Sequence, residues 1–360
     1  MGRPHIVIDV ESGTILSEHL PDHRWYPASL TKLMTAYVTF QAIKAGEIEL
    51  GSPVEVSAAA TRQPPSKMGY KKGTNLRIDT ALKIIIIKSA NDVSQALAEA
   101  VTGDLKNFVE RMNYEAARLG LNNTRFANAN GLHNTNQFSS ARDMALLSRH
   151  IIQEFPQYAY LFSSVAIKTP KQTHYSYNLL LERFPGTTGM KTGFVCASGF
   201  NLVASAKSSG RHLIAVVLGR DSQTDRATTA AKLLEENFLN VDGPSVLSPR
   251  SVGAAPKNMR PVLCTEAARA ARYNPTPSTA IIKSAHLNPR QVSDKILTVN
   301  TGGIDGKPSD AWIFQKFAAK RNVPVPSKRP NYDPIAGKIV LAAIGLRETG
   351  QIAIPTPRPR

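Results

Sequence analysis

A serine and a lysine three residues apart, Ser29 and Lys32, are the side chains of this 360-residue sequence best spaced to do chemistry. Pro27 and Ser29 are typical of a helix start, and apolar residues recur at helical spacing as far as Ile43. Because three residues make almost one helical turn, the Ser29 hydroxyl and the Lys32 amine share a face. If the Lys32 amine is neutral, it can act as a base that takes the proton of the Ser29 hydroxyl and makes that hydroxyl a nucleophile. We therefore expect a helix that begins at Ser29 and ends near Gly46.

Taken alone, Ser-x-x-Lys has a simpler interpretation, a helix cap followed by a surface lysine. A second polar pattern, Ser89-x-Asn91, lies between two apolar segments. The first segment contains four isoleucines, 84–87, which fit either a buried helix or a strand, and the second, 93–101, predicts a helix. Ser89 and Asn91 therefore either cap the second helix or project together into a cleft.

A third pattern, Lys191-Thr192-Gly193, precedes two segments of strand character, 199–206 and 212–219. Ser208-Ser209-Gly210 between them predicts a turn, so we expect adjacent antiparallel strands, with Lys191 at the start of the strand before them. A glycine at 193 lets a ligand approach that strand's backbone. Near the N-terminus a further hairpin is expected, with strands at 5–8 and 14–17.

These three patterns, in this chain order, resemble the set found in penicillin-binding proteins and class A β-lactamases. From about His5 to Phe238 the sequence resembles the low-molecular-mass penicillin-binding proteins, specifically the serine-type D-alanyl-D-alanine carboxypeptidases. The resemblance implies an α/β fold of the penicillin-binding protein and β-lactamase type, with an antiparallel sheet flanked by helices and a helical subdomain. It also implies removal of the terminal D-alanine from peptidoglycan stem peptides, and inhibition by β-lactam antibiotics.

The resemblance assigns a role to each of the reacting side chains. Ser29 attacks the carbonyl between the last two D-alanines to form an acyl-enzyme that water hydrolyses, and Lys32 takes the serine proton. Ser89 relays a proton to the departing D-alanine, and Asn91 holds the peptide. A second cation, Lys191, disfavours the charged form of Lys32.

The resemblance also implies which groups bind the substrate. The backbone N–H groups of Ser29 and Phe194 form the oxyanion hole. Thr192 and Gly193 contact the substrate, and Arg226 aligns with an arginine that the family uses near the terminal carboxylate. From the sequence alone, Arg226 fits equally well as a solvated charge at a helix start.

Composition argues against several other classes of protein. The eight histidines are scattered and none has the His-x-His or His-Glu-x-x-His spacing, so we expect no metal and no cofactor. The two cysteines, Cys196 and Cys264, lie far apart and suggest neither a zinc site nor a disulfide framework, and we expect Cys196 to serve packing. The apolar runs are too short to span a membrane.

The formal charge of +17 is concentrated in the last third of the chain. Residues 241–360 hold 18 Lys and Arg against 7 Asp and Glu, together with 15 of the 24 prolines. This composition predicts a basic, Pro-rich C-terminal region that is largely extended or disordered, after a catalytic domain at 1–240. Within it, residues 290–300 and 337–346 are candidate strands.

The basic tail supports an alternative of another class, an envelope-binding protein that holds an anionic surface through salt-sensitive attraction. Nucleic acid is a poor partner, because the tail has few aromatic residues and no recognisable binding module. A β-lactamase is a further, less favoured alternative, because Ala90 replaces the Asp of that class. A stem-peptide substrate lies outside the cytoplasm, so we expect a periplasmic or envelope protein whose signal peptide is absent from this sequence.

Overall fold

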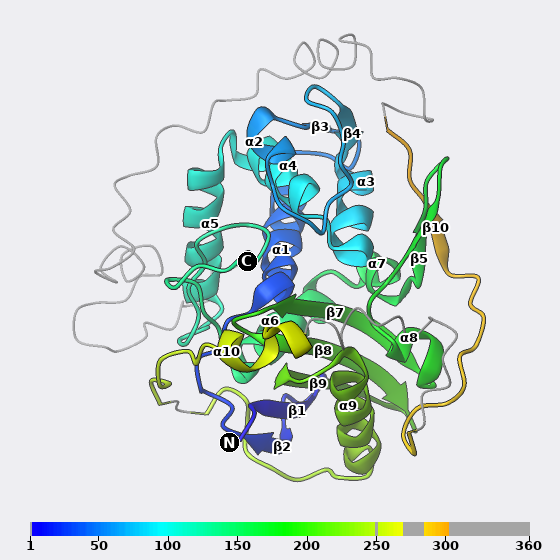
Figure 1. Cartoon of the computed structure of the whole chain (residues 1–360). Helices are drawn as coiled ribbons and strands as arrows, with labels where there is room; N and C mark the ends of the chain where they lie inside the picture. Colours follow the sequence, from blue (N-terminus) through cyan, green and yellow to red (C-terminus); the bar gives the residue numbers. More distant parts are fainter. Residues whose placement is uncertain (1, 249–250, 269–283, 302–360) are drawn as a thin grey trace, which may run out of the picture.

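The computed structural model describes residues 2–248, 251–268 and 284–301 (Figure 1). Its helices and helical turns are η1 (Ala28–Leu30), α1 (Thr31–Lys44), α2 (Ala58–Thr61), α3 (Ile78–Lys83), η2 (Ile84–Lys88), α4 (Asn91–Thr102), α5 (Leu105–Arg118), α6 (Ala141–Glu154), η3 (Pro156–Tyr158), α7 (Ala159–Ser163), α8 (Leu180–Arg183), α9 (Gln223–Asn237) and α10 (Arg260–Leu263). Its strands are β1 (His5–Asp9), β2 (Ile15–His19), β3 (Pro53–Glu55), β4 (Asn75–Arg77), β5 (Ala166–Lys168), β6 (Thr173–Tyr175), β7 (Thr187–Val195), β8 (Gly199–Ser208), β9 (Arg211–Arg220) and β10 (Ile296–Thr298).

The central sheet has the strand order β2-β1-β9-β8-β7, and each neighbouring pair is antiparallel. The two predicted hairpins are therefore confirmed, β1–β2 at the N-terminus and β8–β9 around Ser208. One detail was wrong: Lys191 does not begin its strand, because β7 starts at Thr187. Residues 187–190 also pair with β8, so Lys191 lies in the middle of β7. The paired residues before and after it in the strand fix the direction of its side chain.

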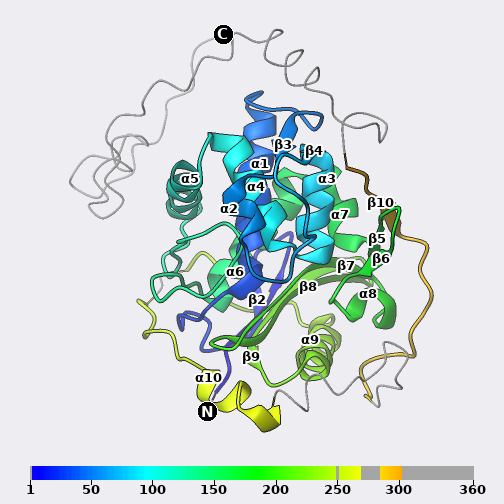
Figure 2. The same cartoon turned by 45° about the horizontal axis from the view of Figure 1, so that its top comes forward.

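The sheet is buried on both faces, because successive side chains of its strands point to opposite sides. On one face Ile6, Ile8 and Ile214 join a core cluster with helices α1, α4 and α6. On the other face Val7 and Leu213 join a smaller cluster with α9. Figures 1 and 2 show this layering, with the α1–α5 region above the sheet and α9 below it.

The helical region above the sheet resolves the ambiguity of the four isoleucines. All four are buried, and they form η2, a single π-helical turn that continues α3. Ser89 then adopts a left-handed backbone conformation, with φ of 63° and ψ of 35°, and α4 begins at Asn91. A π-helical turn is a frequent feature of functional sites because it redirects the residues that follow it.

Some of the described residues after α9 are attached to the rest of the fold. Ser245 bridges to Thr14, and β10 pairs in parallel with β5, which places a strand inside the candidate segment 290–300. The other candidate, 337–346, lies outside the described residues. The expectation of no disulfide was wrong, because Cys196 and Cys264 are bonded to each other across a sequence separation of 68. The disulfide could not be predicted from the sequence, because only the fold brings these two distant cysteines together.

Within the described segments, no helix combines the length and the apolar character needed to cross a lipid bilayer.

Candidate active site

Ser29 and Lys32 lie where the sheet meets the helical region, at the start of α1. Ser29 is part of the 3-10 turn η1, and Lys32 belongs to the first turn of α1. The α-helix therefore begins at Thr31, two residues after the expected start at Ser29. The Lys32 Nζ lies 3.1 Å from the Ser29 Oγ. Ser29 is half-buried, whereas Lys32 is completely buried. The alternative of a surface lysine is therefore excluded.

The Lys32 amine lies within hydrogen-bond distance of three oxygen atoms, two of which can only accept. Besides Ser29 Oγ, Nζ donates to Asn91 Oδ1 at 2.9 Å and to the Asn130 carbonyl at 2.5 Å. A neutral amine has two N–H donors and one lone pair, so the two oxygens use the donors and the lone pair remains for the Ser29 hydroxyl. The geometry therefore fits Lys32 as the base that accepts the Ser29 proton.

Electrostatics favours the same protonation state. Burial lowers the pKa of Lys32 well below its ordinary value of 10.5, and the positive charge of Lys191 lowers it further. The Asp92 carboxylate acts in the opposite direction. Asp92 is itself buried, and it accepts backbone N–H groups from Met68, Gly69 and Val93, which disperse its charge.

Ser89 and Lys191 form the second serine–lysine pair of the site. The Lys191 Nζ donates to Ser89 Oγ at 2.9 Å and to the Thr192 carbonyl at 3.1 Å. Burial, together with the charge of Arg226, lowers the pKa of Lys191 to about 7. Lys32 bonds Ser29 and Asn91, and Lys191 bonds Ser89. The structure therefore joins the three sequence patterns in one place.

The loop at 63–69 and the turn at 128–132 hold Asn91 and Lys32 in position. The Asn91 amide donates to the Pro64 carbonyl at 2.9 Å, and the side chains of Gln63 and Asn130 are hydrogen-bonded to each other. The sequence analysis gave Asn130 no role. The only local signal was Gly131, whose φ of +86° marks a special backbone conformation just after it.

Strand β7 passes directly beside the nucleophile. A Cβ at Gly193 would lie 2.9 Å from the Pro27 carbonyl oxygen and 3.0 Å from the Ser29 nitrogen, so a glycine is needed for this close approach. Thr192 and Lys191 are buried here. Phe194, the other predicted oxyanion-hole residue, follows in the same strand, with its ring centroid 4.3 Å from that of Phe200. The strand is at the edge of the five-stranded sheet, which is where a peptide can lie alongside it.

Arg226 reaches β7 from the first turn of α9. It is only 3% exposed, so the alternative of a solvated charge does not hold. Its guanidinium donates to the carbonyls of Tyr177 at 2.8 Å and of Gly193 at 3.4 Å. Among the described residues no carboxylate forms a salt bridge with it. Burial lowers its pKa to about 9, because desolvation disfavours the charged guanidinium.

The arrangement as a whole can carry out acyl transfer. It contains a half-buried hydroxyl beside a buried lysine amine of lowered pKa, a second hydroxyl with its own amine, and a buried cation next to an edge strand. The described residues include no cluster of three or more His, Cys, Asp or Glu side chains suited to a metal ion. Lys32 Nζ, 3.1 Å from Ser29 Oγ, is placed to accept the serine proton.

Comparison with known proteins places this geometry in a family. The family model of D-alanyl-D-alanine carboxypeptidases, peptidase family S11, matches residues 2–222. The chain is 39% identical over 245 residues to the D-alanyl-D-alanine carboxypeptidase DacA of Haemophilus influenzae, an alignment that covers 67% of this chain and 62% of that protein. Across three curated relatives the matched share of the relative is 61–63%, so the chain spans about three fifths of their length.

Solved structures agree with the sequence comparison. Penicillin-binding protein 5 from Haemophilus influenzae superposes with a TM-score of 0.63 at 38% identity, covering 66% of this chain and 70% of that one. Penicillin-binding protein D2 from Listeria monocytogenes, in its cefotaxime-bound form, gives a TM-score of 0.60 at 28% identity, covering 66% of this chain and 96% of that one. The expected fold class is thereby confirmed for the part of the chain up to α9.

Proposed function

The chain belongs to the D-alanyl-D-alanine carboxypeptidase family, and from that membership we propose that it removes the terminal D-alanine from peptidoglycan stem peptides through an acyl-enzyme on Ser29. The observation that carries the proposal is the set of contacts around the buried Lys32 Nζ, which bonds the acceptors Asn91 Oδ1 and Asn130 carbonyl while Ser29 Oγ lies 3.1 Å away. No metal and no cofactor enters the proposed reaction.

In the first half of the proposed reaction Ser29 Oγ attacks the carbonyl carbon between the two D-alanines, and its proton passes to Lys32 Nζ. The C–N bond then breaks, and Ser89, held by Lys191, passes its proton to the departing amine and takes up in exchange the proton that Lys32 accepted, so that both side chains return to their starting state. The negative charge that develops on the carbonyl oxygen is stabilised by the backbone N–H groups assigned to the oxyanion hole, those of Ser29 and Phe194.

In the second half, water attacks the ester carbonyl, the Ser29–acyl bond breaks and the serine regains its proton. Arg226 and Thr192 are proposed to hold the free carboxylate of the substrate, with Gly193 allowing the peptide to approach β7. This role for Arg226 is supported by its burial and by its bonds to neutral carbonyl oxygens. A carboxylate is the partner that a desolvated guanidinium binds most strongly.

We propose the same serine as the target of β-lactam antibiotics, which acylate nucleophiles that recognise D-alanyl-D-alanine. The Listeria protein of similar fold was solved with cefotaxime bound. Rapid antibiotic hydrolysis is the less favoured alternative. Class A β-lactamases activate their deacylating water with the glutamate of a Glu-x-x-Asn segment between the second and third patterns. The match in this interval, Glu110 to Asn113 in α5, has an exposed glutamate. The Asn113 side chain bonds the backbone of Val109 and Phe126 there, which is a structural role.

Mass spectrometry of the intact chain tests the proposal. Incubation with penicillin is expected to add one antibiotic mass at Ser29, and the untreated enzyme is expected to release D-alanine from a synthetic pentapeptide. Ser29→Ala should abolish both. A matched control is Ser94→Ala, since the Ser94 hydroxyl is buried and bonds only the Ala90 carbonyl of its own helix. D-alanine release by Ser29→Ala at the control's rate would refute the mechanism.

We further propose an extracytoplasmic location, in the periplasm or cell envelope, where the stem peptides are. The Cys196–Cys264 disulfide supports this proposal, because disulfides persist in oxidising compartments.

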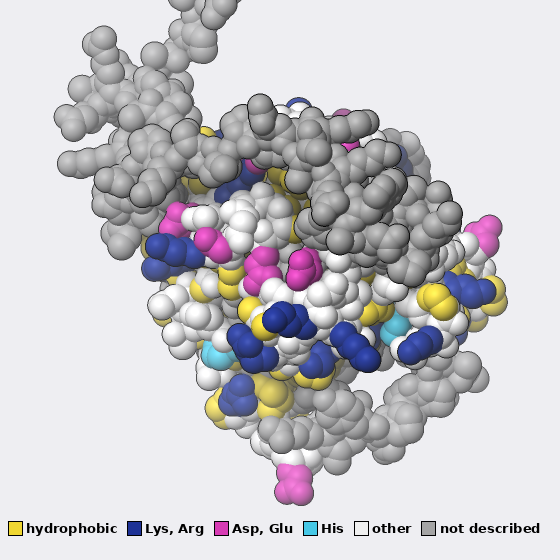
Figure 3. Space-filling view, turned by 90° about the horizontal axis from the view of Figure 1, so that it is seen from above, with side chains coloured by type: hydrophobic (Ala, Val, Ile, Leu, Met, Phe, Trp, Pro, Cys, Tyr) yellow, Lys and Arg dark blue, Asp and Glu magenta, His cyan; other side chains and the backbone are white. Residues whose placement is uncertain are grey.

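A second function of another class, binding of an anionic envelope surface through the basic tail, is a separate proposal. It is favoured by the charge of residues 241–360 and by a band of Lys and Arg side chains on the described surface (Figure 3). The division at residue 240 also remains a proposal. Because Cys264 and β10 attach part of this region to the core, the truncation should follow residue 301. Loss of binding to anionic phospholipid vesicles, with D-alanine release unchanged, is the expected result, and unchanged binding would contradict it.

A further inference from the structure

The turn between β7 and β8, residues 196–198, is fastened to the segment that carries α10. Cys196 is disulfide-bonded to Cys264, and the Met259 N–H donates to the Ala197 carbonyl at 2.9 Å. The Leu263 side chain covers Gly199, since a Cβ there would lie 2.9 Å from Leu263 Cδ1. We call this set of contacts, the disulfide with Met259 and Leu263, the α10 clamp.

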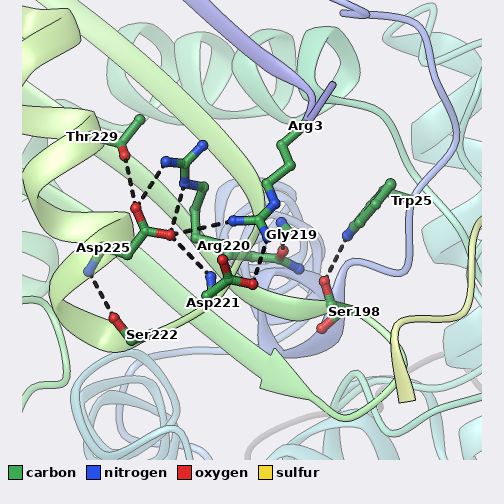
Figure 4. Close-up of polar contacts among 10 residues, drawn as sticks. Arg3, Trp25, Ser198, Gly219, Arg220, Asp221, Ser222, Asp225 and Thr229 are labelled. Atoms are coloured by element: carbon green, nitrogen blue, oxygen red, sulfur yellow. Dashed lines mark hydrogen bonds and ion pairs between the residues drawn. The ribbon is translucent and has the colours of Figure 1, made fainter. Parts of the chain in front are cut away.

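The same turn is tied on its other side to the chain that leads into the nucleophile. The Trp25 indole Nε1 donates to the Ser198 carbonyl at 2.8 Å, and Figure 4 shows the indole N–H pointing at that oxygen. The Asn201 amide donates to the Tyr26 carbonyl at 2.9 Å and to that of Pro27 at 3.2 Å. The position of the turn therefore sets how closely β7 approaches the Ser29 segment.

The contact between β7 and the Ser29 segment leaves no room for an added atom. Gly193 packs so closely on the Pro27 carbonyl and the Ser29 nitrogen that even a Cβ would collide there. Phe194 and Val195 connect Gly193 directly to Cys196. A displacement at the turn is therefore transmitted within three residues to the point where β7 meets the nucleophile.

The clamp itself depends on the disulfide. Among the described residues 254–268, Met259 and Leu263 are the buried ones, and α10 has only four residues. So small an apolar contact holds a short segment weakly without a covalent link. Cys264 also lies beyond residues 2–222, the part of the chain matched by the family model.

From these contacts we propose that the α10 clamp is a positioning element for catalysis. The Cys196–Cys264 disulfide holds the end of β7 against the Ser29 segment in the geometry needed for acylation, so a part of the chain outside the family match completes the site. The inference rests on the proposed function, because its measured quantity is the acylation of Ser29. Neither cysteine touches the substrate, and both act through β7.

The test compares the oxidised full-length protein with Cys196→Ser/Cys264→Ser. At saturating fluorescent penicillin the acylation rate constant is expected to fall at least about tenfold in the double variant, because small misplacements near a reacting group are costly. Trp25→Phe, which removes the indole N–H together with the five-membered ring of this buried side chain, is expected to lower the same constant. The matched control is Val262→Ala in α10, whose side chain is 63% exposed and which should acylate like the wild type.

Assays well below the melting temperature of every variant separate positioning from stability. A purely structural disulfide would lower the melting temperature and leave the acylation rate constant unchanged, which would overturn the inference. If the double variant fails to fold, reduction and reoxidation of the folded wild type provide the comparison, and the rate must fall and return. If the oxidised wild type forms no adduct, the proposed function fails, and the inference falls with it.

Discussion

Replacing Gly131 with alanine is the sharpest test of how the nucleophile and its base are held. Gly131 follows Asn130, whose carbonyl binds Lys32 Nζ, and it packs against the chain just before Ser29. A Cβ at this position would lie 1.9 Å from the Ala28 carbonyl oxygen and 2.9 Å from the Ser29 nitrogen. One added methyl group at residue 131 therefore collides with the backbone of Ala28 and Ser29. It also displaces residue 131 itself, which follows the Asn130 carbonyl that binds Lys32.

The size of the effect follows from these distances. Side-chain Cβ atoms essentially never approach other atoms below 3.0 Å, so the 1.9 Å contact requires a movement of about 1 Å. A misplacement of about 1 Å near the reacting atoms costs roughly 100-fold in rate. That factor corresponds to about 2.7 kcal/mol of activation free energy. We therefore expect the acylation rate constant of Gly131→Ala to fall by about two orders of magnitude.

Gly103 offers a matched control for backbone strain. Its φ of +87° is almost identical to the +86° of Gly131, but a Cβ there would have nothing within 4 Å. Both alanine variants must adopt a positive φ, which costs roughly 1–3 kcal/mol of folding stability. Only Gly131→Ala also displaces the site. The ratio of the two acylation rates therefore isolates the steric effect.

The assay is stopped-flow acylation by a fluorescent penicillin at saturating concentration, with thermal unfolding of each variant measured in parallel. Gly103→Ala should lose stability and keep the wild-type acylation rate. If Gly131→Ala remains folded and acylates within about threefold of Gly103→Ala, the argument that this contact positions Ser29 and Lys32 is refuted.

Three further predictions follow from charge and from the disulfide. Because the positive charge of Lys191 lowers the pKa of Lys32, Lys191→Met should raise the pKa of Lys32. The acidic limb of the acylation–pH profile should then move to higher pH. If the residual acylation rate of the variant shows the same acidic limb as the wild type, this coupling is contradicted. The pKa of Lys191 is lowered from 10.5 to about 7, so between these pH values the unfolded chain binds a proton that the folded protein lacks. The free energy of unfolding should therefore rise with pH in this window, less steeply in Lys191→Met, as urea titrations at several pH values can measure. Removing the Cys196–Cys264 bond, which spans a separation of 68 residues, should lower the free energy of unfolding by about 4 kcal/mol, and a loss below about 1 kcal/mol would show that the reduced chain is already constrained.

Local pattern accounts for much of what the sequence predicted. The spacing of Leu30, Leu33 and Met34 identified α1, and the strand pairs β1–β2 and β8–β9 followed from short apolar runs around turns. These features depend on residues within a few positions of one another, so they can be predicted from the sequence without knowledge of the fold. The three polar patterns were legible for the same reason, and together they indicated the family.

The sequence by itself therefore determined the main elements and picked out the polar side chains that the fold brings together. Tertiary structure alone decided that Lys32 is buried between Asn91 and Asn130, that Arg226 is desolvated, and that Cys196 is bonded to Cys264. The physical reason is that protonation, desolvation and disulfide pairing depend on neighbours in space. The partners of Lys32 Nζ on α4 and in the turn before α6 are 59 and 98 residues away along the chain, a distance over which no local pattern carries information.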